Sequence, residues 1–112
     1  MLITKKYNKN DVVTIKLATG EEVVGYYCGH DDDSITLRKP VTPVPTQEGR
    51  MALAPFLMSS DYMQNNEELD FNTNTVVVAS KTNQAFADAY TQQVSGLDLS
   101  PAAGGKPGLI KA

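Results

Sequence analysis

The stretch DVVTIKLATGEEVVGYYCGHDDDSITL, residues 11–37, decides the fold of this chain. Apolar and polar side chains alternate over residues 12–18 up to a turn at Gly20, and such alternation is typical of a half-buried strand. A second β-rich run covers residues 23–29, and after three consecutive Asp residues the apolar alternation resumes over residues 35–39. The stretch therefore predicts three short antiparallel strands joined by two turns.

Gly25 stands inside the second of these predicted strands. A glycine within a strand commonly marks a sharp bend or a place where another backbone approaches closely. A bend of this kind is what a short sheet needs in order to curl into a small barrel. We therefore expect Gly25 to have a structural role at the point where the sheet bends.

The order of turn and strand residues in this stretch resembles the first signature of the Sm-like (LSm and Hfq-type) RNA-binding family. The pattern consists of a Leu, a turn Gly, a second Gly five residues later, an Asp at the end of the second strand and an apolar third strand. Here these positions are Leu17, Gly20, Gly25, Asp31 or Asp32, Ile35 and Leu37. It is a pattern of spacing, and other small, strongly bent barrels of the SH3 type produce much of it.

The resemblance implies a fold class. A divergent Sm-like member is expected to be mainly β, with a small, strongly bent five-stranded antiparallel barrel of the SH3 type. The sequence adds a C-terminal helix to this barrel, because apolar residues recur at helical spacing over residues 83–95, Thr82 or Asn83 can cap its start and Gly96 can end it. We expect one domain over residues 1–96, in which the helix packs onto the barrel, followed by a flexible Pro/Gly-rich tail over residues 97–112.

Two further segments are unusually apolar. Residues 51–58 form a nearly unbroken apolar run, and residues 75–79 read as a short strand that is apolar on both faces. Strands of this kind must be covered on both sides, and open apolar edges recruit other strands. We therefore expect copies of the chain to join edge to edge in a cyclic homo-oligomer, as Sm-like rings do with their fourth and fifth strands. The predicted interface residues are Leu53, Phe56, Val76, Val77 and Val78.

The resemblance also implies a nucleic-acid site, which this sequence alters. Sm-like proteins stack a uridine base two residues after the loop Asp and hydrogen-bond it with an Asn two residues later; Ser34 and Thr36 stand at those positions here. The Arg-Gly pair of the second signature is missing, and the polar segment 61–73, expected to be a loop, replaces the tight turn. The candidate nucleic-acid-binding residues are His30, Ser34, Thr36, Arg38 and Ser59.

The formal charge of −3 and the pI near 5.0 argue against a general nucleic-acid coating protein, which needs a basic surface. The charges are unevenly distributed, because most lysines precede residue 40, whereas residues 61–98 hold six carboxylates and only one lysine, Lys81. The single Cys28 cannot form an internal disulfide, and the sequence shows neither a signal peptide nor an apolar run long enough for a membrane span. We expect a soluble cytoplasmic protein with no membrane partner.

No motif in the sequence indicates catalysis. Residues 31–33 and His30 offer oxygen and nitrogen ligands for a cation, but adjacent side chains in an extended loop point in different directions, so a solvated turn is the favoured interpretation. Cys28 lacks a matching set of activating residues, and there is no nucleophile elbow or phosphate loop. The sequence predicts no enzyme, no cofactor and no metal.

Two hypotheses about function remain open. The first is a ring-forming Sm-like module that binds single-stranded RNA or DNA without catalysis. The second is a structural or assembly module that uses the same barrel for protein contacts, which the acidic pI and the altered pocket favour. Phage-encoded proteins of this size that lack enzymatic motifs often have such a role, and this analogy suggests a phage origin.

Overall fold

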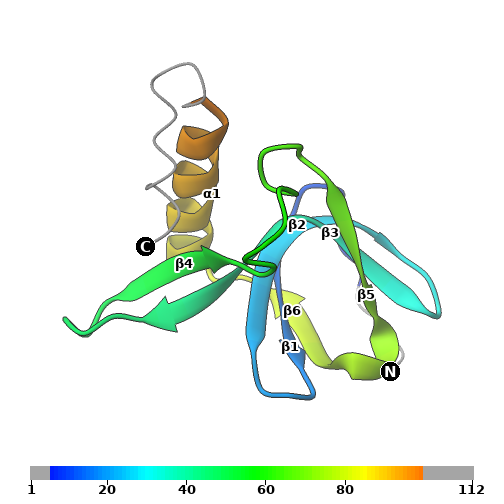
Figure 1. Cartoon of the computed structure of the whole chain (residues 1–112). Coiled ribbons are helices and arrows are strands. Elements are labelled where there is room, and N and C mark those ends of the chain that lie inside the picture. The colour runs from blue at the N-terminus through cyan, green and yellow to red at the C-terminus, as the bar shows by residue number, and fades with distance from the viewer. Residues whose placement is uncertain (1–5, 100–112) are drawn as a thin grey trace.

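The computed structural model of the chain describes residues 6–99. Figure 1 shows strands that curl around one another, with a single helix standing to one side. In chain order the elements are β1 (Val12–Leu17), β2 (Glu22–His30), β3 (Ser34–Pro45), β4 (Met51–Pro55), β5 (Glu68–Asn72), the 3₁₀ helix η1 (Thr73–Thr75), β6 (Val76–Lys81) and α1 (Gln84–Leu99).

The strands form one antiparallel sheet in the order β4-β3-β2-β1-β6, with β5 also paired to β3. The first half of β3 pairs with β5, and its second half pairs with β4. Figure 1 shows the second half of β3 and β4 leaving the body as a two-stranded arm beside α1. We refer to residues 41–55, the second half of β3 with β4 and their connecting turn, as the β3–β4 arm.

The predictions of a mainly β chain and of a C-terminal helix are confirmed, but the predicted closed barrel of five strands is wrong. The sheet has six strands, because the arm adds β4, and its path is not closed. The two end strands of the bent part, β5 and β6, are joined through η1 and do not pair with each other. The segment predicted as a loop over residues 61–73 contains β5.

The third predicted strand is longer than expected. Pro40 was predicted to end it, yet β3 continues to Pro45 through a residue with positive φ, Lys39 at 53°. The ladder between β2 and β3 shifts register between Val24 and Tyr26, at the level of this bend. A proline is tolerated in a strand at such an irregularity, because the missing N–H costs no regular ladder bond there.

The bend at Gly25 is confirmed. A Cβ atom on this residue would lie 3.2 Å from the carbonyl oxygen of Arg38, 3.2 Å from the Cβ of Leu37 and 3.2 Å from the Cα of Pro40. The two backbones therefore approach each other more closely than a side chain at this position would comfortably allow. Glycine is needed here for space, which lets β3 fold tightly over β2.

Two hydrophobic clusters result from this bend. The first fills the curled part of the sheet between β1, β2, β3, β5 and β6, and the second lies between the arm, the loop after it and α1. Burying a large aliphatic or aromatic side chain contributes about 1.5–3 kcal/mol, so each cluster stabilises its own half of the molecule. The first cluster includes Val13, Ile15, Leu17, Val23, Tyr27, Ile35, Leu37, Phe71, Val76 and Ala79, and the second includes Val24, Val41, Leu53, Tyr62, Met63, Tyr90 and Val94.

The helix begins as predicted and ends later. The Asn83 side chain accepts a hydrogen bond from the backbone N–H of Phe86 at 2.8 Å and so caps the first turn. The helix continues through Gly96 to Leu99, so residues 97–99 of the predicted tail are helical, and residues 100–112 lie outside the described part. Between residues 6 and 99, no helix has the length and apolar character needed to cross a membrane.

Candidate nucleic-acid interface and oligomer edges

Three of the five predicted nucleic-acid-binding residues share one face of β3. Ser34, Thr36 and Arg38 are half-buried and alternate with core residues, and in the ladder they stand opposite Asn72, Asp70 and Glu68 of β5. Residues paired across an antiparallel ladder point to the same side of the sheet. We call this surface, made of these three residues and their β5 partners, the β3 outer face.

Arg38 is held in place on this face by three neighbours. Its guanidinium lies over the ring of Tyr26, 4.5 Å from the ring centroid, which is a cation–π arrangement. One terminal nitrogen donates to Oδ1 of Asn66 at 3.2 Å and the other to Oδ1 of Asn10 at 3.3 Å. The side chain is therefore oriented in advance, while an arginine has five N–H donors in total and keeps some for a ligand.

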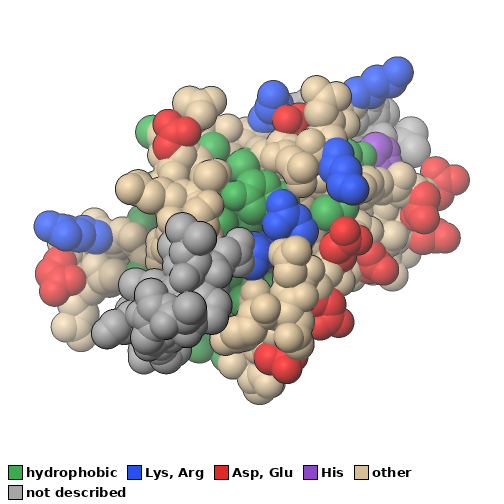
Figure 2. All heavy atoms as spheres, turned by 90° about the horizontal axis from the view of Figure 1, so that it is seen from above, with side chains coloured by type: hydrophobic (Ala, Val, Ile, Leu, Met, Phe, Trp, Pro, Cys, Tyr) green, Lys and Arg blue, Asp and Glu red, His purple; other side chains and the backbone are tan. Residues whose placement is uncertain are grey.

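Carboxylates line the same face. Asp70 accepts a hydrogen bond from the Thr36 hydroxyl, and Glu68 stands opposite Arg38 in the ladder. Figure 2 shows further acidic side chains beside the histidine, which lies outside this face. Negative charge at this density repels a phosphate backbone, so any nucleic acid bound here would depend on base contacts more than on counterion release.

His30 is separated from the other predicted residues. It pairs with Ile35, whose side chain faces the core, and its Nδ1 lies 2.5 Å from the hydroxyl of Tyr27. The Tyr27 ring also makes an edge contact with Tyr7, with centroids 5.3 Å apart. His30 therefore belongs to an aromatic cluster at the end of β2 and not to the β3 outer face.

Ser59 is also separate from the β3 outer face. It is exposed in the turn after β4, outside the strands that carry the other four predicted residues. The structure thus brings together three of the five residues that the sequence predicted.

The turn between β2 and β3 is joined to η1, a link that the sequence analysis missed. Thr73 is buried, and its N–H donates to the carbonyl of Asp33 at 2.9 Å while its hydroxyl donates to the carbonyl of Asp32 at 2.8 Å. Inside the turn, Oδ1 of Asp31 accepts the N–H groups of Asp33 and Ser34, each at 2.8 Å. These bonds lower the pKa of Asp31, because they favour its charged form.

The described residues hold neither a cluster of metal ligands nor an activated thiol. Among residues 6–99 no cluster of three His, Cys, Asp or Glu side chains could hold a metal ion. Burial, together with the nearby Glu68 carboxylate, raises the pKa of the Cys28 thiol, which keeps this sulfur in its less reactive protonated form.

The five predicted interface residues have different environments. Leu53 and Val76 are buried in the chain's own two clusters. Phe56 is half-buried and packs against Phe71 with centroids 5.2 Å apart. Val77 and Val78 are 62% and 49% exposed on the end strand β6.

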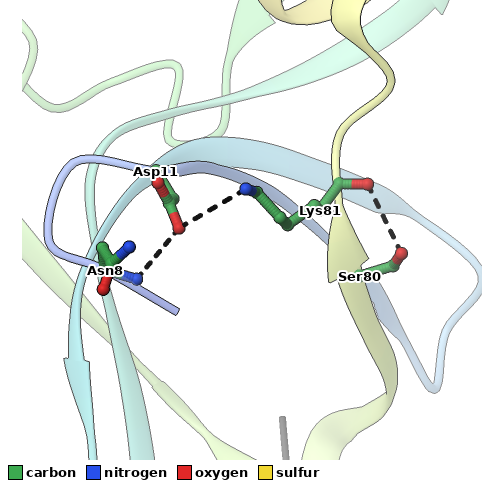
Figure 3. Close-up of polar contacts among 4 residues, drawn as sticks. All are labelled: Asn8, Asp11, Ser80 and Lys81. Atoms are coloured by element: carbon green, nitrogen blue, oxygen red, sulfur yellow. Dashed lines mark hydrogen bonds and ion pairs between the residues drawn. The ribbon is translucent and has the colours of Figure 1, made fainter. Parts of the chain in front are cut away.

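The far end of β6 is anchored to the start of β1. Nζ of Lys81 lies 3.9 Å from Oδ2 of Asp11, which also accepts the backbone N–H of Asn8 at 2.9 Å (Figure 3). The Lys81 side chain remains 65% exposed, and an ion pair this exposed contributes at most about 1 kcal/mol. Lys81 is thus available to a second negative partner.

An apolar hollow of about 370 Å³ lies between the arm and the helix. Met51 and Leu53 of β4 form one wall, and Phe86 and Ala89 of α1 form the other. Of the residues predicted to bind nucleic acid or to form the oligomer interface, only Leu53 lines it.

A scan against protein-family models finds no match for this chain, and a search of curated proteins finds none either.

Proposed function

We propose that this chain is a non-catalytic, ring-forming module of the Sm-like type that binds single-stranded nucleic acid. The observation that carries the proposal is the pair of free edges, on β5 and on β6, which are opposite in charge.

Each of the two strands has one edge that is unpaired within residues 6–99. β5 pairs with β3 and β6 pairs with β1, and in this part of the chain neither has a second neighbour in the sheet. An open edge that also exposes apolar side chains, as β6 does with Val77 and Val78, is a template for strand addition. Pairing β5 of one copy with β6 of the next satisfies the backbone groups of both.

The charges on the two edges are complementary. β5 exposes Glu68 and Asp70, whereas β6 ends in the exposed Lys81 and lies beside Lys16 of β1, which pairs with Val78. In an antiparallel alignment, Lys81 of the partner subunit stands at the Glu68 end of β5. Pairing two copies of β5 would oppose like charges instead. Head-to-tail contacts are favoured, and they close into rings when the rotation permits.

The strand order also supports an Sm-like module. When β4 is set aside, the remaining strands follow the order β5-β3-β2-β1-β6, a bent five-stranded sheet with β5 and β6 at its ends. The arm and the loop after it then form an insertion between the third and fourth strands of the pattern. Joining the fourth strand to the fifth strand of a neighbour is the contact that the sequence resemblance implies.

The β3 outer face supplies groups that suit bases. Arg38 offers donors and a planar surface, and Ser34 and Thr36 offer hydroxyls. A ring of subunits would repeat this weak site around an axis. One nucleic-acid strand could then bind several subunits at once, which raises its overall affinity. Because phosphate contacts are few, the affinity should depend only weakly on salt.

Fluorescence anisotropy with oligo-U, oligo-A and single-stranded DNA, each at two salt concentrations, tests the binding. Protein concentrations should reach about 100 μM, which covers the usual range of weak non-specific binding. Binding that Arg38→Ala reduces and that salt changes little supports the proposal. No binding to any of the three oligonucleotides at low salt would refute the nucleic-acid part.

Light scattering after size-exclusion chromatography tests the ring. The native chain should have the mass of a closed oligomer, and Val77→Glu should lower that mass because it places a negative charge on the apolar edge, opposite the acidic β5. Met51→Glu is the matched control, since Met51 is 59% exposed on β4, a strand that the proposed pairing does not use. A single-subunit mass for the native chain would refute the ring.

The acidic β3 outer face favours a second candidate, an assembly module that binds a basic protein segment. Affinity capture from native lysate, with and without nuclease, separates the two. Recovered RNA that requires Arg38 supports the first function. A protein whose recovery survives nuclease and requires Glu68 and Asp70 supports the second.

A further inference from the structure

The turn after β4, residues 56–60, holds two apolar side chains in solvent. Leu57 is 41% exposed and Met58 is 74% exposed. The turn is closed by a bond from the N–H of Ser60 to the carbonyl of Leu57 at 3.4 Å. Exposed apolar side chains on an ordered turn indicate a surface that another molecule covers.

A buried tyrosine fixes this turn to the sheet. The N–H of Phe56 donates to the hydroxyl of Tyr62 at 2.7 Å, and that hydroxyl donates to the carbonyl of Pro40 at the bend of β3. Tyr62 is fully buried. Because the turn is anchored at its first residue, Leu57 and Met58 are presented in a defined place.

The turn formed by residues 56–60 lies next to β5. The ring of Phe56 packs on the ring of Phe71, with centroids 5.2 Å apart and planes inclined by 58°. Phe71 belongs to β5, whose other edge is free. The exposed turn therefore lies beside the strand that is proposed above to receive β6 of a partner subunit.

The proposed strand pairing determines which residues of the partner subunit lie next to this turn. The joined sheet keeps its buried face on one side only if core-facing residues of the two strands pair, because residues paired across a ladder point to the same side. The register that meets this condition places Lys81 of the partner subunit opposite Glu67, Ala79 of the partner subunit opposite Leu69 and Val77 of the partner subunit opposite Phe71. The exposed valines of β6 therefore arrive beside the residue on which Phe56 packs.

We propose that Leu57 and Met58 form an apolar latch over Val77 and Val78 of the partner subunit. This inference rests on the proposed ring, and it assigns to the inserted segment a role in closing that ring. Within the described residues, the exposed large apolar side chains are Met51, Leu57, Met58, Val77 and Val78. The latch covers four of these five, and the charge pairing between Glu67 and Lys81 of the partner subunit sets its position.

Cross-linking between introduced cysteines tests the contact. In a Cys28→Ser background, the double variant Met58→Cys/Val77→Cys is treated with a short bismaleimide and analysed on a denaturing gel. The expected result is a ladder of covalent multimers. Met51→Cys/Val77→Cys is the control, because Met51 lies on β4 outside the latch, and it should give no ladder.

The native mass of each variant, measured before cross-linking, separates the two proposals. A ring mass with a ladder supports the latch. A ring mass without a ladder overturns the latch and leaves the ring standing. A single-subunit mass overturns both.

A second measurement needs no cysteines. Met58→Glu should raise the concentration at which the ring dissociates by at least about tenfold, because a large apolar contact is lost. Met51→Glu should leave that concentration unchanged. Equal dissociation for the two variants would contradict the latch even if both fold normally.

Discussion

The hydroxyl of Tyr62 donates a hydrogen bond to the carbonyl of Pro40 and accepts one from the backbone N–H of Phe56. One side chain thus ties the bend of β3 to the segment that follows β4. The aromatic ring that carries this hydroxyl is completely buried in the second hydrophobic cluster. Tyr62 therefore satisfies two backbone groups that water reaches poorly.

We predict that Tyr62→Phe lowers the free energy of unfolding by about 1–3 kcal/mol, because both backbone partners lose their hydrogen bond in a buried place. Urea denaturation measures this change. Tyr7→Phe is the control: within the described residues the buried hydroxyl of Tyr7 has no partner, so its removal should be neutral or stabilising. A loss as large for Tyr7→Phe as for Tyr62→Phe would contradict the explanation.

We predict that Gly25→Ala destabilises the fold by about 1–3 kcal/mol, the usual cost of overpacking. The added methyl group would meet backbone and Cβ atoms of β3 at 3.2 Å, and these cannot move without opening the bend. Thermal and urea unfolding both report the loss. Ser80→Ala on the exposed side of β6 should stay close to wild type, and a comparable loss there would show that the method detects something other than crowding.

We predict that Asn83→Ala costs about 0.5–2 kcal/mol, because the N–H of Phe86 loses its cap. Asn83→Ser should recover most of the loss, since serine is also a good N-cap. Hydrogen exchange should show faster exchange in the first turn of α1 for the Ala variant alone. Equal exchange in both variants would mean that the cap does not limit the opening of the helix.

We predict that stability falls as the pH rises above 10 and that Tyr90 contributes to the fall. Burial raises the pKa of Tyr90 well above the ordinary 10.0, and its hydroxyl donates to the carbonyl of Lys39 at 2.7 Å. Below pH 10 both the folded and the unfolded state keep the proton. Above pH 10 the unfolded state loses it and the folded state does not, which favours unfolding.

Urea denaturation across this pH range, compared between wild type and Tyr90→Phe, checks the prediction. The wild type should lose up to about 1.4 kcal/mol more per pH unit than the variant, which has no proton to lose at this position. Tyrosinate absorbance should show one fewer late-titrating group in the folded variant. Identical slopes for the two proteins would contradict the assignment.

The local pattern of the sequence was enough for part of the fold. The alternation around Ile15 predicted β1, the glycine at position 25 predicted the bend, and Asn83 predicted the start of α1. In each of these cases the local preference and the packing agree. The run from Met51 to Met58 was misjudged, because its apolar residues divide between β4 and the turn that follows.

Elements whose local signals conflict with their context could not be predicted. Pro40 ordinarily ends a strand, but the register shift opposite Gly25 accommodates it, and only the three-dimensional pairing reveals this. The strand ELDFN, residues 68–72, alternates correctly but follows an Asn-rich polar segment that reads as a loop. Its existence depends on pairing with the first half of β3.

The candidate site was predictable only as a list of positions along β3. Side chains alternate between the two faces of a strand, and this alternation placed Ser34, Thr36 and Arg38 on one face, as the structure has them. The residues that orient Arg38, which are Tyr26, Asn10 and Asn66, come from distant parts of the chain and have no common sequence pattern. For the same reason, Thr73 gave no signal that it would hold the turn between β2 and β3.

The ladder pair between Arg38 and Glu68 has a consequence for how this chain can change. The backbone leaves the curled sheet after Arg38 and returns to it at Glu68, which is paired with Arg38 in the ladder. The excursion between them is not a passive insertion, because Val41, Leu53 and Tyr62 belong to it and form the second hydrophobic cluster with α1. A change in its length is therefore tolerated most easily at the turn between β3 and β4, away from this cluster, where the chain could vary without disturbing either core.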